Sequence, residues 1–283
     1  MKRNLFIISI SLLFIYLIFT NTSLVSSSIL TSCNLFLTKV FISLFPMYIL
    51  SKILINYNLP YYLTKLFKNS YIYILLISIL SGTPNNAVII KDLLDKKQIT
   101  IKDANKYIMC NFFINPLFLI TMLQTIIPIK QALILILISY STNIIIYLIQ
   151  KPTHHTNLEK VKEIPFNELL IKETNNATNI FLCILEMIII FNLISIYIPK
   201  ALNPFIGILE VTNGLNYLAK TPYPLYITSI LILIYLNFGG LSIYMQIKSI
   251  LNKTNISDTN YLYGRFYAII ISIILYLFIT LFI

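Results

Sequence analysis

The sequence predicts an all-α polytopic membrane protein with two pseudo-symmetric repeats that contain broken or re-entrant helices. Hydrophobic residues make up 58% of the 283 residues and charged residues only 11%, with a mean hydropathy of +0.82. Soluble domains carry about 25% charged residues, so this composition is typical of a chain that crosses a membrane several times. Gly and amide residues interrupt some of the apolar runs, and such interruptions predict broken helices.

Residues 1–28 are predicted to form an N-terminal transmembrane anchor. The pair Lys2-Arg3 precedes an apolar run over residues 5–19, and a Ser-rich stretch follows. This pattern is also typical of a signal peptide, which is the alternative interpretation. We favour an uncleaved helix whose N-terminus lies in the cytoplasm, because no small-residue cleavage site is evident and further spans follow.

The first gate repeat is predicted over residues 29–150. Its expected apolar segments lie at 30–55, 71–80, 117–127 and 131–150. Pro46 is expected to kink the first of them. Between the second and third, Thr100 and Asp103 have the spacing of a capping box, which predicts the start of a helix at this point.

A break interrupts this repeat at Ser81-Gly82-Thr83-Pro84-Asn85-Asn86, before an amphipathic helix over 85–97. In lipid, each unpaired backbone group costs several kcal/mol, so irregular backbone is tolerated only inside protein or beside water. A broken helix at membrane depth therefore predicts a binding site or a gate.

Residues 151–174 are predicted to form a polar cytoplasmic loop. His154 and His155, with Glu159 downstream, raise the alternative of a metal site. Adjacent residues do not share a helix face, so we favour a solvated loop without metal. The net charge of +11 lies in short connectors rather than on one face. This distribution indicates membrane orientation, and we expect no nucleic-acid partner.

The second gate repeat is predicted over residues 175–283. Its apolar segments lie at 176–198, 222–236 and 261–283, and its interruptions at 203–214 and 237–242. Glu186 lies in the plainest of these spans, where an interfacial position explains it as well as a function does.

Gly82 and Gly239 are 157 residues apart (239 − 82 = 157), and the same offset aligns Thr100 with Ser257. This offset predicts that the two breaks correspond and that both following helices begin at a hydroxyl cap. The second repeat carries fewer charges than the first, which is compatible with an approach from the outer face of the membrane. In that orientation the two repeats are inverted relative to each other.

Glu210 is the sharpest single candidate for function. A carboxylate at mid-membrane costs about 2–3 kcal/mol, so it is expected to face a cavity or a partner. The alternative is a solvated position near the interface.

The predicted substrate-binding residues are polar residues at the breaks: Glu210, Thr212, Asn213, Asn85, Asn86, Asn237, Ser242 and Gln246. The predicted gate or hinge residues are Gly82, Pro84, Gly207, Gly214, Gly239 and Gly240. The alternative for the amides is that they cap the broken helices without a ligand. Asn111 and Asn115 are expected to satisfy the break at Pro116.

Several of these motifs resemble a known family. The segment Ser81-Gly82-Thr83-Pro84-Asn85-Asn86 resembles the first gate segment of the nucleoside-recognition (Gate) domain family, apart from a departure at Thr83-Pro84-Asn85. The segments 207–214 and 238–246, and Tyr261-Leu262-Tyr263-Gly264-Arg265, are similar to the second half of YlbJ-type sporulation integral membrane proteins. The resemblance implies a bacterial cell-membrane protein linked to endospore cortex formation. It also implies a gate architecture distantly similar to concentrative nucleoside transporters, without establishing a nucleoside substrate.

The sequence thus favours transport of a small polar solute or ion. The alternative is a non-transporting sporulation membrane factor that recruits partners. The partners we expect are the lipid bilayer and that solute or ion, and a homo-oligomer is compatible with the sequence. We expect no enzyme activity and no cofactor, because the acids are scattered, the two His are adjacent in a loop, and no nucleophile precedes a base.

Overall fold

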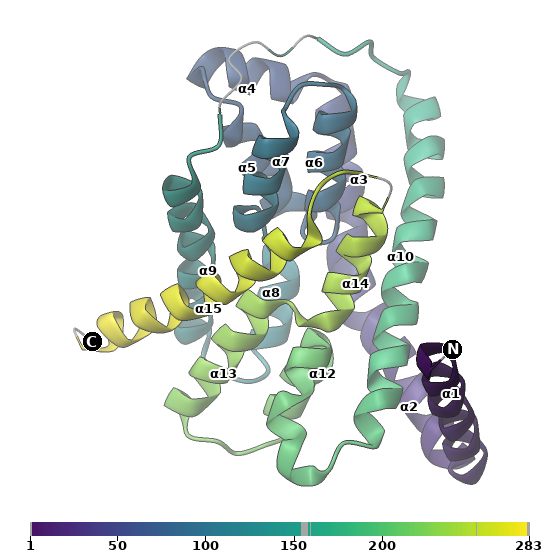
Figure 1. Ribbon diagram of the computed structural model, residues 1–283. Helices are drawn as coiled ribbons and strands as arrows, with labels where there is room; N and C mark the ends of the chain where they lie inside the picture. The colour runs from purple at the N-terminus through teal and green to yellow at the C-terminus, as the bar shows by residue number, and fades with distance from the viewer. Residues whose placement is uncertain (1, 154–157, 159, 253, 282–283) are drawn as a thin grey trace.

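The computed structural model describes residues 2–153, 158, 160–252 and 254–281, and every regular element within them is a helix (Figure 1). The all-α fold class is therefore confirmed. Five helices in the described residues are long and apolar enough to cross a membrane: Thr22–Asn56, Ile129–Gln150, Phe166–Ile196, Leu225–Leu251 and Asp258–Thr280. Large apolar side chains such as Leu137, Ile171 and Ile274 are more than half exposed, which is compatible with a multi-pass membrane protein.

The chain begins with two helices that lie side by side. Helix α1 (Lys2–Thr20) packs on α2 (Thr22–Leu35), and Tyr197 donates a hydrogen bond to the carbonyl of Leu17 at 3.0 Å. Helix α2 continues through a π-helical turn, η1 (Phe36–Phe41), into α3 (Ile42–Asn56), which contains Pro46. The first long span thus begins at Thr22, earlier than the predicted residue 30, because the Ser-rich stretch is helical. Serine hydroxyls there bond to backbone carbonyls of the preceding turn.

The remainder of the first half consists of shorter helices and one full span. In chain order they are α4 (Leu59–Phe67), α5 (Tyr71–Ser81), α6 (Asn85–Asp95), α7 (Ile101–Cys110), α8 (Pro116–Leu123) and α9 (Ile129–Gln150). Helices α5 and α6 pack against each other as a hairpin joined at residues 82–84. The predicted cap of α7 is confirmed, because the Thr100 hydroxyl accepts from the Asp103 N–H at 3.1 Å and donates to its carboxylate at 2.6 Å.

The second half follows the same alternation of long and short helices. Its elements are α10 (Phe166–Ile196), the 3-10 helix η2 (Lys200–Phe205), α11 (Ile206–Leu209), α12 (Val211–Ala219), α13 (Leu225–Phe238), α14 (Gly240–Leu251) and α15 (Asp258–Thr280). Helix α10 begins inside the predicted polar loop, since Leu169 and Glu173 are buried against the bundle. Ser257 lies at the N-cap of α15, but its hydroxyl pairs with that of Thr259 rather than with a backbone N–H. The hydroxyl cap predicted there is therefore wrong.

Helices from the two halves interleave at the centre of the molecule. Helix α6 packs against α14, α7 packs against α15, and α10 packs against α2 and α3 (Figure 1). The breaks between α5 and α6, α7 and α8, α11 and α12, and α13 and α14 thereby lie in the protein interior rather than against lipid. Interior positions allow the freed backbone groups to find protein partners.

The predicted gate glycines have two different structural roles. Gly82, Gly239 and Gly240 have φ angles of 70°, 84° and 77°, in the left-handed region that favours glycine. Gly207 and Gly214 instead allow close approach, because a Cβ at Gly214 would lie 2.2 Å from the Gly207 Cα. Hinge motion at any of them stays a prediction.

Candidate functional site

A central cavity, about 490 Å³ including its opening, lies where three of the breaks meet. Its polar lining consists of Thr83, Glu210, Thr212, Ser242 and Gln246. Its apolar wall comes from η1, α3 and α10 and from residues near the breaks: Val40, Leu44, Ile184, Ile188, Ile114, Phe118, Val211 and Ile243. Four of the eight predicted substrate-binding residues are thus brought together, although they come from different helices.

Glu210 is buried between the short helices α11 and α12. Its side chain is 4% exposed and caps α12, because the carboxylate accepts a hydrogen bond from the Asn213 N–H at 2.7 Å. No Lys or Arg nitrogen of the described residues forms an ion pair with it within 4.0 Å. An interior carboxylate without a cationic neighbour favours a bound cation, a proton or a strong hydrogen-bond donor in the cavity.

Ser242 and Gln246 lie one helical turn apart on α14 and face the same cavity. They are 1% and 5% exposed. The Ser242 hydroxyl has no hydrogen-bond partner among the described residues. Because a buried hydroxyl without a partner costs free energy, this position suits a polar ligand or water in the cavity.

Some asparagines of the α5–α6 and α7–α8 breaks form hydrogen bonds that satisfy the backbone there. Asn86 donates to the carbonyl of Asn111, and Asn111 donates to the Ser78 hydroxyl at 2.8 Å. Asn115 caps α8 by accepting from the N–H groups of Leu117 and Phe118. The expectation that Asn115 satisfies the break at Pro116 is therefore confirmed, and the capping interpretation also fits Asn86.

The other predicted amides are buried but do not line the central cavity. Asn85 is 2% exposed, and neither its amide nitrogen nor its oxygen has a partner in the described structure. The Asn213 amide nitrogen is likewise unpaired. Asn237 donates to Ser139 and Leu233 and borders a separate small cavity of about 200 Å³. A direct role in ligand binding stays a prediction for these three residues.

Arg265 is the principal interior residue that the sequence-based site list omits. Its guanidinium is fully buried and donates to the carbonyl of Met109 at 2.8 Å and to that of Asn237 at 3.3 Å. These carbonyls belong to the last turns of α7 and α13, where the helix dipoles are negative. A third bond reaches the Asn143 side-chain oxygen at 2.9 Å, and the Phe112 ring lies 4.2 Å away. A lone arginine within an apolar span is the sequence signal that would have identified it.

A second buried carboxylate, also absent from the predicted list, lies on α10. Glu173 is 8% exposed and accepts hydrogen bonds from the Tyr48 hydroxyl at 3.2 Å and the Asn176 amide at 3.3 Å. Lys52 lies over the Tyr48 ring, 5.4 Å from its centre. This cluster joins α3 to α10 and lies outside the central cavity.

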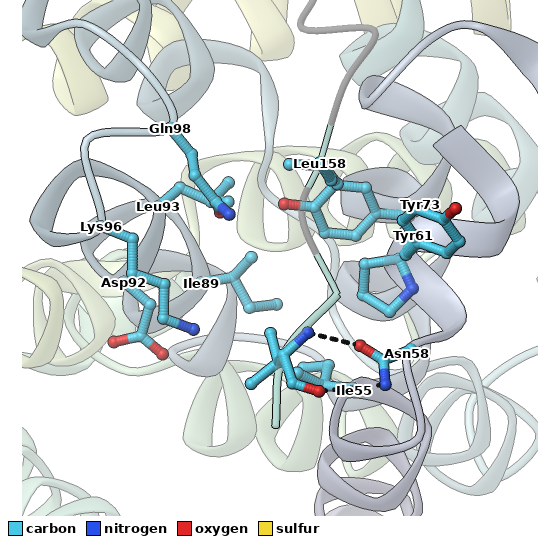
Figure 2. Close-up of a pocket in the computed structure, with 12 residues that line it drawn as sticks. Ile55, Asn58, Tyr61, Tyr73, Ile89, Asp92, Leu93, Lys96, Gln98 and Leu158 are labelled. Atoms are coloured by element: carbon cyan, nitrogen blue, oxygen red, sulfur yellow. Dashed lines mark hydrogen bonds between the residues drawn. The ribbon is translucent and has the colours of Figure 1, made fainter. Parts of the chain in front are cut away.

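A peripheral pocket of about 540 Å³ lies between α4, the α5–α6 hairpin and the connector after α9 (Figure 2). Tyr61 and Tyr73 contribute rings to it, and Asp92 and Lys96 contribute charges. Asn58 fastens the connector by exchanging two hydrogen bonds with the backbone of Val161. None of the predicted site residues lines this pocket.

The described residues contain no group of three or more His, Cys, Asp or Glu side chains that could hold a metal ion. His154, His155 and Glu159, which raised the alternative of metal binding, lie outside the described residues.

Comparison of the chain with protein-family models, curated proteins and solved structures finds no match.

Proposed function

We propose that the protein moves a small polar solute or ion across the cell membrane through the central cavity. The observation that carries the proposal is the convergence of Thr83, Glu210 and Ser242 from three separate breaks on one interior space. Broken helices whose polar groups meet inside a membrane protein are typical of transporter binding sites. The apolar outer surface and the five candidate spans support residence in the bilayer.

The order of the elements supports two pseudo-symmetric repeats. Each half has a long helix, a hairpin, a broken segment and a final span: α3, α5–α6, α7–α8 and α9 in the first half, and α10, α11–α12, α13–α14 and α15 in the second. This order pairs the first break with Glu210 rather than with Gly239. An offset of 127 residues places Asn86 on Asn213 (213 − 86 = 127) and Asn115 on Ser242 (242 − 115 = 127). We favour this pairing over the offset of 157.

The two hairpins support an inverted arrangement. The α5–α6 hairpin lies toward the end of the molecule shown at the top of Figure 1, and α12 lies toward the opposite end. Helices that enter from opposite faces and stop at the centre are re-entrant in a membrane. The lysine-rich connectors over 52–68, 91–106 and 151–172 support a cytoplasmic position for the upper end by the positive-inside rule. Because α1 pairs with α2, this orientation directs the N-terminus toward the cytoplasm.

A role in endospore cortex formation rests on the family resemblance of residues 81–86, 207–214 and 238–246. Transport during sporulation and a non-transporting role that recruits partners both fit that resemblance. The cavity favours transport, because Glu210 borders it together with the unpaired Ser242 hydroxyl and has no cationic partner among the described residues, although its carboxylate also caps α12.

Flux into proteoliposomes tests this proposal with sodium, choline and uridine as tracers. We expect uptake of at least one tracer above that of empty liposomes, and at least a tenfold loss in Glu210→Gln. The matched control is Glu186→Gln, which alters an exposed carboxylate on α10 and is expected to keep wild-type flux. Equal flux in wild type and Glu210→Gln, at equal protein content, contradicts a role for the cavity in transport. The absence of flux for every tracer favours the non-transporting role.

A further inference from the structure

The contact between α6 and α14 contains an open cleft at the lysine-rich end of the molecule. It is lined on α6 by Val88, Lys91 and Asp92, and on the other side by Ser249, Ile250 and Asn252. The cleft has a volume of about 910 Å³ including its opening. It adjoins the peripheral pocket, because Asp92 borders both, but its other lining residues differ.

The cleft and the central cavity lie one above the other along α14. Gln246 borders the cavity, and Ser249 and Ile250 border the cleft. Three or four residues correspond to about 5 Å along a helix, so the two spaces are separated by roughly one helical turn. The i, i+3 and i, i+4 spacing also places these residues on one face of α14. On the facing side, Thr83 of the cavity precedes α6 and Val88 of the cleft lies within it, so side chains of the α6–α14 contact lie between the two spaces.

The charges in the cleft and in the central cavity determine which solutes can pass between them. The cleft carries Asp92 and Lys91, which offset each other, so it favours neither sign. The cavity carries Glu210, and none of the described residues that line it is basic. Its neutral oxygens, above all the unpaired Ser242 hydroxyl, add acceptors for a cation. The central cavity, rather than the cleft that leads to it, is therefore expected to exclude anions.

We propose that the α6–α14 contact is the route between the lysine-rich face and the central cavity, and that the cavity admits small cations or cationic solutes in preference to anions. The route rests on the proposed transport function for its purpose, but its accessibility and charge preference are measurable without any flux. The ligand class follows from one carboxylate, several neutral oxygens and an apolar wall that border one space.

Cysteine labelling tests the route with two thiol reagents of similar size and opposite charge. Cys33, Cys110 and Cys183 are free and are first replaced by Ala. Ser242→Cys is then reacted in proteoliposomes with trimethylammonium-ethyl or sulfonatoethyl methanethiosulfonate, applied at the lysine-rich face. The cysteine sulfur displaces methanesulfinate and forms a mixed disulfide. We expect the cationic reagent to react at least tenfold faster, and this preference to disappear when Glu210→Gln is added.

Two bulky substitutions on α14 locate the path. Ser249→Trp, at the exposed cleft, is expected to slow labelling of Ser242→Cys at least tenfold, whereas Met245→Trp, on another exposed position, is expected to leave it unchanged. Ser272→Cys, fully buried on α15 and outside the cavity, is expected to remain unlabelled. Gln246→Cys provides the same readout if Ser242→Cys does not fold.

The outcomes separate the route from transport. Labelling that is absent, faster with the anionic reagent, or unaffected by Ser249→Trp overturns the proposal. Labelling as expected in a protein that passes no tracer supports the route and contradicts transport. Flux that depends on Glu210 but is insensitive to Ser249→Trp supports transport and contradicts the route.

Discussion

Replacement of Arg265 by Met tests how the interior of the bundle is held together. The guanidinium joins the C-terminal carbonyls of α7 and α13 to Asn143 on α9. Gly264 allows this approach, since a Cβ there would lie 2.2 Å from the Met109 carbonyl oxygen. Met retains an unbranched apolar stem but donates no hydrogen bond, so three buried acceptors lose their donor.

The expected loss follows from these three bonds. Hydrogen bonds between membrane helices average about 0.6 kcal/mol, and bonds to charged groups in soluble proteins are worth about 1.5–3 kcal/mol. An intermediate value of about 1 kcal/mol for each bond gives a destabilisation of about 3 kcal/mol. In a protein of this size that corresponds to a fall in melting temperature of about 5 °C. Arg265→Lys is expected to lie between wild type and Arg265→Met, because one ammonium replaces a planar group that reaches acceptors on both sides.

Thermal unfolding in detergent measures the effect. It is followed by circular dichroism or by the fluorescence of a thiol-reactive dye, because the chain contains no tryptophan. Lys172→Met is the control, because it removes a cation from an exposed position on α10 and is expected to leave the melting temperature unchanged. A melting temperature for Arg265→Met within about 1 °C of wild type would refute the reasoning, since the three acceptors would then have found other partners.

Three further predictions concern packing, the connector and pH. Gly214→Ala places a methyl group 2.2 Å from the Gly207 Cα and is expected to destabilise the protein by about 1–3 kcal/mol; an unchanged melting temperature contradicts it. Asn56→Ala removes two hydrogen bonds to the backbone of Ile164 and is expected to raise tryptic cleavage after Lys160 or Lys162 about tenfold or more, with Asn56→Asp intermediate. Burial opposes ionisation of the Asp103 carboxyl, but hydrogen bonds from Thr100 and Thr153 outweigh it and hold its pKa below the ordinary value. Its stabilising contribution is therefore present above about pH 4 and lost as pH falls through the lowered pKa, so melting of Asp103→Asn should depend less on pH in that range.

Local signals in the sequence determine much of this protein. Hydropathy over about twenty residues identifies the long spans, Gly82 and Gly239 mark where helices stop, and Pro116 marks where one begins. The cap at Thr100 and the cap at Asn115 are also readable, because a cap depends on residues within one helical turn. Glu210 is predictable from the sequence for a different reason, because a carboxylate in an apolar run is costly wherever that run packs.

Only the tertiary structure decided which of these local features meet. Glu210 and Ser242 share a cavity with Thr83, whereas Asn85 and Asn237 do not, although all belong to breaks of similar composition. The acceptors of Arg265 lie on helices far from it in sequence. The physical reason is that a helix end leaves several polar groups unpaired, and their partners depend on which other helix ends converge in space. Sequence spacing describes one helix at a time, and convergence is a property of the packed bundle.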